Sequence, residues 1–68
     1  MKWKSNFQHP QGWTFQIEYD SFAMSYYLYI WNERGDNTHD YDQDTLEIAQ
    51  EQAFEDFGVP LDSWKQIE

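Results

Sequence analysis

Residues 13–19 read Trp-Thr-Phe-Gln-Ile-Glu-Tyr, and residues 22–32 read Phe-Ala-Met-Ser-Tyr-Tyr-Leu-Tyr-Ile-Trp-Asn. In the first stretch, aromatic and aliphatic side chains alternate with polar ones, which is the two-residue period of a strand with one buried face. In the second stretch, both sides become apolar toward the C-terminal end, which indicates a central strand. Asp20-Ser21 reads as a turn, so the two stretches predict an antiparallel pair.

The residues around this pair extend the predicted sheet in both directions. Asn32 to Asn37 form a loop with Gly35 placed for a positive φ, which predicts a hairpin into a short third strand at about 37–41. Upstream, His9-Pro10-Gln11-Gly12 is typical of a turn. Residues 2–8 alternate weakly, with Trp3, Ser5 and Phe7 on one side, and this pattern fits either an edge strand or a loose arm.

A helix is predicted at about 43–57. Asp42 is a suitable N-cap, and Asp44 competes with it for that role. One helical face carries Leu46, Ala49, Ala53 and Phe57, with Phe54 at its margin. Gly58 is placed to end the helix and Pro60 to block its continuation. A last helical turn is expected around residues 62–64.

We therefore expect one domain over residues 1–68, of class α+β. It is predicted to have a three-stranded antiparallel β-meander, four-stranded if residues 2–8 join, followed by one α-helix packed on one face. The predicted core contains side chains from two strands and the helix: Phe15, Ile17, Leu28, Ile30, Leu46, Ala53 and Phe57.

One helix covers only one face of such a sheet, so the other face must meet water or a partner. If Leu28 faces the helix, strand alternation turns Tyr27, Tyr29 and Trp31 to the uncovered side. Large exposed aromatic patches mark interaction sites, which favours self-association or a partner interface. The alternatives are that the N-terminal segment or Trp64 folds over this side, or that the rings stack on a sugar.

The formal net charge of −9 restricts the classes of partner. It argues against direct binding of nucleic acid and of anionic membranes, and it favours a basic protein. No apolar run approaches membrane-spanning length, and Met1-Lys2-Trp3-Lys4 lacks the apolar core of a signal peptide. We expect a complete small cytoplasmic protein. The absence of cysteine excludes disulfides and thiolate metal sites.

Between Arg34 and Lys65 the chain has nine acidic residues and no lysine or arginine. Four of them form an acidic stripe, falling within about 80° of one another around the predicted helix: Asp44, Glu47, Glu51 and Glu55. This pattern indicates a solvated face, a docking face for a basic protein, or an acidic face that mimics a phosphate backbone.

A second cluster suggests a different chemistry. Asp40, Asp42, Asp44 and Glu51 superficially match positions 1, 3, 5 and 12 of a calcium loop, and His39 beside Asp40 is a potential general base or metal ligand. Position 6 is Thr45 instead of glycine, and no cysteine nucleophile or triad order is present. We predict no catalytic residue, no metal site and no cofactor.

The leading hypothesis is a non-enzymatic acidic protein-binding module that engages a basic protein, such as one that handles nucleic acid. The acidic stripe would steer association, while Tyr27, Tyr29 and Trp31 would supply contact area, in this partner or in a homodimer. Size, acidity and aromatic content are shared with inhibitors of the bacterial immunity, antitoxin and phage anti-defence kinds. The alternative is a small metal-binding or hydrolytic protein that uses Asp40, Asp42, His39 and Glu51.

Overall fold

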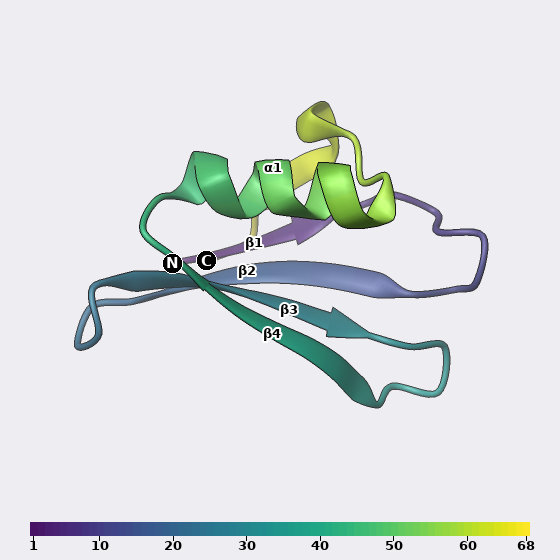
Figure 1. Cartoon of the computed structure of the whole chain (residues 1–68), viewed down its shortest axis with the longest axis horizontal. Helices are drawn as coiled ribbons and strands as arrows, with labels where there is room; N and C mark the ends of the chain where they lie inside the picture. Colours follow the sequence, from purple (N-terminus) through teal and green to yellow (C-terminus); the bar gives the residue numbers. More distant parts are fainter.

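The computed structural model describes residues 1–68 and shows one five-stranded antiparallel sheet with one α-helix on one side of it (Figure 1). The strands are β1 (Lys2–Ser5), β2 (Thr14–Asp20), β3 (Ser25–Trp31), β4 (Asn37–Gln43) and β5 (Trp64–Gln66), in the sheet order β4-β3-β2-β1-β5. The α-helix α1 spans Leu46–Phe57, and a 3₁₀ turn, η1, spans Leu61–Ser63. The α+β class and the antiparallel meander before the helix are confirmed, but four strands precede the helix and a fifth follows it.

The β2–β3 pair forms as predicted, except that its hairpin is wider. The carboxylate of Asp20 accepts hydrogen bonds from the backbone N–H groups of Phe22 (2.9 Å) and Ala23 (3.3 Å), which folds residues 21–24 into a turn. Met24 adopts a positive φ of 55° in that turn. The prediction that β3 begins at residue 22 is therefore wrong, and Phe22 and Met24 are 99% and 74% exposed at the hairpin tip.

Both ends of the chain join the same edge of the sheet. Residues 2–5 form β1, which pairs with β2, so the N-terminus is a strand and not a loose arm. The expected edge position is wrong, because β1 is an inner strand of the sheet. The three-residue β5 then pairs with the other side of β1, a strand that the sequence pattern did not predict. The N–H of Lys2 donates to the carbonyl of Glu68 at 3.0 Å, so the two termini lie side by side.

The helix begins later than predicted. β4 continues through Asp42 to Gln43, because these residues pair with Tyr27 and Tyr26 of β3. The N-cap is Thr45, whose hydroxyl accepts from the N–H of Ile48 at 3.1 Å, so the assignment of Asp42 or Asp44 as the cap is wrong.

The end of the helix is as predicted. Gly58 takes the left-handed conformation (φ 75°), and its N–H donates to the carbonyl of Phe54 at 3.0 Å. No helix in the structure has the length and apolar character that crossing a bilayer requires.

The core lies between α1 and the covered face of the sheet. Seven hydrophobic side chains are buried there: Phe15, Ile17, Leu28, Ile30, Ala49, Ala53 and Val59. Leu46 and Phe57 were predicted to be core residues but are only partly buried at its margin. Val59 takes part of their place, because the turn at Gly58 folds it back under the helix with its N–H bonded to the carbonyl of Ala53 at 3.2 Å.

Candidate functional site

The two-layer fold gives the molecule two outer surfaces that point in opposite directions. One is the outer side of α1, and the other is the face of the sheet that α1 does not cover, here called the open face (Figure 1). The acidic stripe belongs to the first surface and its adjoining loop, and the Tyr27, Tyr29 and Trp31 side chains belong to the second. A single compact partner therefore cannot readily contact both sets of predicted binding residues at once.

The acidic stripe is exposed and has no basic counterpart. Glu47, Glu51 and Glu55 lie on the side of α1 opposite the buried Ala49 and Ala53. Asp44 is exposed in the short segment between β4 and the helix. The chain has two ion pairs, and neither involves the stripe: Lys2 with Glu68 (3.5 Å) and Arg34 with Asp36 (3.6 Å).

Two exposed apolar side chains border the stripe. At 100° per residue, Phe54 lies on one side of the Glu47–Glu51–Glu55 row and Ile48 on the other. They are 51% and 43% exposed. Sequence reasoning placed Phe54 only at the margin of the core face and did not single out Ile48. The exposure of both residues could have been predicted, because neither fits the helical spacing of the core residues Leu46, Ala49 and Ala53.

The open face carries an aromatic ladder along β3. The rings of Tyr27 and Tyr29 stack with centroids 6.1 Å apart, and Tyr29 and Trp31 follow at 5.9 Å. All three side chains are half-buried. β1 lies beside β2 in the plane of the sheet, and Trp64 packs against the core on the covered side. The interpretation that the termini fold over this ladder is therefore wrong.

Polar and charged side chains flank the ladder, and their charge changes from negative to positive across the sheet. On its β4 side, Asp40 is directly opposite Tyr29 and Asp42 is directly opposite Tyr27. On its other side come Gln16 and Glu18 of β2, and then the lysines of the two outer strands: Lys2, Lys4 and Lys65. The open face thus changes from acidic at β4 to basic at β1 and β5, and it holds three of the four basic residues of the chain.

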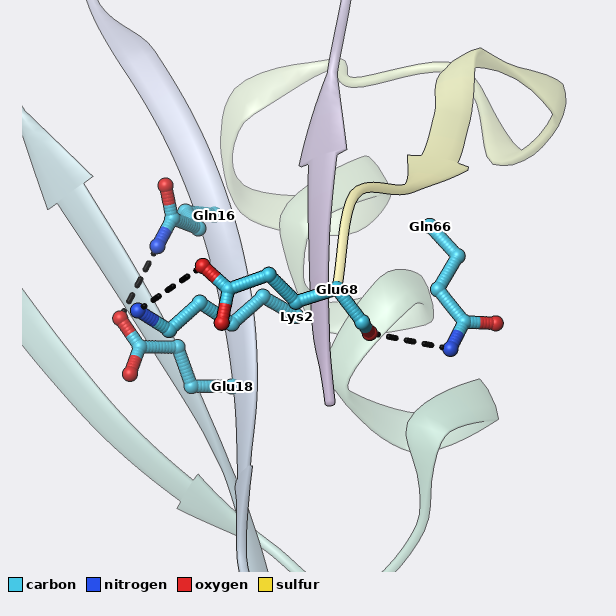
Figure 2. A network of polar contacts seen from close by, with 5 residues as sticks. All are labelled: Lys2, Gln16, Glu18, Gln66 and Glu68. Atoms are coloured by element: carbon cyan, nitrogen blue, oxygen red, sulfur yellow. Dashed lines mark hydrogen bonds and ion pairs between the residues drawn. The ribbon is translucent and has the colours of Figure 1, made fainter.

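Figure 2 shows the polar contacts around Lys2 and the C-terminal residue. Lys2 pairs with the Glu68 carboxylate, and the amide of Gln16 donates to Glu18 at 2.9 Å. The side chain of Gln66 donates to the backbone carbonyl of Glu68 at 3.0 Å and holds the C-terminal residue in place. Lys4 and Lys65, opposite each other in the β1–β5 pair, make no ion pair within the chain.

The pKa of Tyr29 reports the environment of the ladder. It is raised from the ordinary value of 10.0, first because burial disfavours the charged phenolate and then because of the negative charges of Glu18 and Asp40. These carboxylates come from the strands on either side of β3. The centre of the open face therefore disfavours additional negative charge.

The metal or hydrolytic cluster of the alternative hypothesis is not assembled. His39 lies on the covered side of β4, stacked on Tyr41 (5.8 Å) and edge-on to Phe57 (5.4 Å). Asp40 and Asp42 lie on the open face, and Glu51 lies on the outer side of the helix. No group of three or more His, Asp or Glu side chains is placed to hold a metal ion.

A hollow lies elsewhere, between β1 and the loop at residues 6–13. Its volume is about 280 Å³. Its one imidazole, His9, stacks on Trp13 at 5.4 Å and accepts a hydrogen bond from the N–H of Gln11 through Nδ1. The lining has no carboxylate to pair with this imidazole, so it offers no acid–base pair.

Comparison with protein-family models, curated protein sequences and solved structures gave no match to this chain.

Proposed function

We propose that this chain is a non-enzymatic protein-binding module whose helix α1 engages a basic protein surface. The observation that supports the proposal is the acidic stripe, whose carboxylates have no ion-pair partner in the chain and lie between the exposed Phe54 and Ile48. An apolar contact bordered by charges of one sign is suited to bind a surface of the opposite sign.

The two components of this surface would act at different stages of binding. Glu47, Glu51 and Glu55 recur at every fourth position, so their spacing is about 6 Å along the helix axis. The field of such a row raises the association rate with a basic surface and is weakened by salt. Phe54 and Ile48 would lose contact with water only in the complex, so they would control its lifetime.

A row of carboxylates competes for the sites where a basic protein binds phosphates. We therefore propose a partner that handles nucleic acid in the cytoplasm, with this chain acting as its inhibitor in the manner of immunity, antitoxin or phage anti-defence proteins. The support is charge and exposure alone. Metal binding or hydrolysis by Asp40, Asp42, His39 and Glu51 is not favoured, because the fold distributes these residues over three surfaces.

The test is a comparison of two triple variants with the same change in net charge. E47Q/E51Q/E55Q neutralises the stripe, while E33Q/D36N/D62N neutralises three exposed carboxylates outside the helix. Each is immobilised and titrated with purified basic DNA- and RNA-binding proteins at low and high salt. We expect the stripe variant alone to lose at least about tenfold in affinity, and duplex DNA to compete with the parent chain.

Equal affinities of the two triple variants would show that net charge alone is responsible and would overturn the proposal. The variant F54S/I48S separates the apolar contribution, because it should increase the dissociation rate with little change in the association rate. A thermal melt with calcium or zinc addresses the alternative. An unchanged melting temperature is expected, and a rise would show that a metal binds the folded state.

A further inference from the structure

We propose that two copies of this chain associate through their open faces, related by a twofold axis parallel to the strands. The Lys2 and Lys4 side chains of each copy would face the Asp42 and Asp40 side chains of the other. This inference does not depend on the helix surface, and it assigns the aromatic ladder to a second copy of this chain instead of to a different protein.

The first reason is that the open face is nearly balanced in charge, whereas the chain as a whole is not. Its strands present the carboxylates of Glu18, Asp20, Asp40 and Asp42 together with three lysines, of which Lys2 is also paired with Glu68. The other surfaces therefore carry most of the net charge of −9. Two copies can therefore bring their open faces together while most of their negative charges stay far apart on the outer surfaces.

The second reason is that the charges are arranged as complementary halves. In the row that contains Tyr29, the residues across the sheet are Asp40, Tyr29, Gln16, Lys4 and Lys65. In the neighbouring row, they are Asp42, Tyr27, Glu18 and Lys2. Each row has an aspartate beside an aromatic ring at one end and lysine at the other, with Glu18 next to Lys2 in the second row. In a reversed copy of the same row, the aspartate of each chain therefore faces a lysine of the other.

This arrangement selects one orientation of the two sheets. A twofold axis that runs across the strands would place β4 over β4 and oppose Asp40 to its own copy. An axis parallel to the strands, between β2 and β3, reverses the strand order instead. It sets β4 over the partner's β1 and β3 over the partner's β2. Asp40 then faces Lys4, Asp42 faces Lys2, and the rings of the ladder lie between these pairs.

Known packing geometry accommodates this arrangement. Sheets stack face to face about 10 Å apart with their strands within about 30° of one another, and side chains fill the space between them. A standard interface covers about 800 Å² per partner, less than a fifth of the 4460 Å² surface of this chain. Association through the β4 edge is less suitable, because it would bring Asp40 and Asp42 close to their own copies.

The resulting dimer would present both acidic stripes on its two outer sides. Two stripes on one particle make it bivalent toward a basic partner, which increases avidity without any new contact. A monomeric variant should keep the affinity of a single stripe. This separates the two proposals, because failure of the dimer leaves binding through α1 intact, and failure of that binding leaves the dimer intact.

The main test is a charge swap on two separate chains, with mass measured by sedimentation velocity over a range of concentrations. One chain carries K2E/K4E and the other carries D40K/D42K. Alone, each is expected to be monomeric, with a dissociation constant raised at least about tenfold over the parent, because like charges would face each other. Mixed one to one, they should form a heterodimer in which every facing pair is again of opposite sign.

A measurement on the unmodified chain covers the case in which a variant does not fold. Within one chain, Lys4 and Asp40 are three strands apart, about 14 Å, with Gln16 and Tyr29 between them. A zero-length carbodiimide cross-link between Lys4 and Asp40 is therefore expected only between chains, and a mixture of ¹⁵N-labelled and unlabelled protein identifies it by mass. A parent chain that remains monomeric at high concentration, or a dimer that lacks this cross-link, would overturn the proposal.

Discussion

The hydroxyl of Ser5 lies 2.8 Å from the hydroxyl of Ser63, and both residues are buried. The contact joins β1 to η1, which lie at opposite ends of the chain. It is one link of a continuous network. The N–H of Phe7 donates to Ser5 Oγ (3.0 Å), and Ser63 Oγ donates to the carbonyl of Pro60 (2.6 Å). The proton between the two hydroxyls therefore comes from Ser5.

This network predicts a coupling between the two serines. S5A leaves the N–H of Phe7 without its acceptor. S63A leaves the hydroxyl of Ser5 without its acceptor, while the carbonyl of Pro60 keeps the N–H of Ser63 as a donor. Each change should therefore lower the free energy of unfolding by about 1–3 kcal/mol. Because both variants break the same link, S5A/S63A should cost less than the sum of the single changes. Urea denaturation of the four chains measures the coupling. Strict additivity would show that the two hydroxyls act independently.

Leu28 and Phe22 both lie in the apolar stretch 22–32, but the wide hairpin predicts very different effects on stability when they are replaced. Leu28 is fully buried, and L28A should destabilise the fold by about 2–5 kcal/mol, enough to unfold a marginal domain. Phe22 is 99% exposed, and F22S should change stability by less than about 0.5 kcal/mol. Circular dichroism melts decide this. A large loss of stability in F22S would show that Phe22 contributes to the core.

The acidic stripe predicts a stability that depends on salt. Glu47–Glu51 and Glu51–Glu55 are like-charge neighbours four residues apart, each unfavourable by about 0.2–0.5 kcal/mol. Added salt at neutral pH should raise the melting temperature of the parent chain, and E51Q should raise it at low salt while reducing its salt dependence. D62N, outside the helix, serves as the matched control. A parent melting temperature that falls or stays constant with salt would contradict this prediction.

The raised pKa of Tyr29 predicts a loss of stability in alkali. The unfolded chain releases the Tyr29 proton near the ordinary pKa of 10.0, whereas the folded chain holds it to higher pH. The free energy of unfolding should therefore be unaffected below pH 10.0 and decrease as the pH rises past this value toward the folded pKa. Y29F should flatten this decrease in urea titrations performed below and above the ordinary pKa.

A second variant tests the cause of that shift. E18Q removes the negative charge that contributes most after burial, so the absorbance titration of the Tyr29 phenol should move to lower pH. An unchanged titration in E18Q would show that the charge of Glu18 does not contribute to the shift.

The sequence pattern correctly predicted those elements whose periodicity or end signal lies within a few neighbouring residues. The alternation around Phe15 and Ile17 identified β2 and its buried face, because side-chain direction in a strand has a strict period of two. Gly58 fixed the end of the helix, because a left-handed cap favours glycine. The sequence pattern mispredicted the start of the helix, where capping and strand pairing compete for the same residue. Asp42 is a good cap by composition, but β3 offers it a strand partner, so the helix begins after Thr45.

The sequence by itself determined the α+β class, the order of β2, β3, β4 and the helix, the core of Phe15, Ile17, Leu28 and Ile30, and the acidic outer side of α1. These depend on periods of two and 3.6 residues and on charge, which are properties of contiguous segments. Only the tertiary structure decided that β5 closes the sheet beside β1, where Lys65 lies opposite Lys4. Three-residue strands have too few positions to show a period. The gradient from Asp40 to Lys4 likewise exists only because strand pairing brings residues from distant parts of the chain into one row.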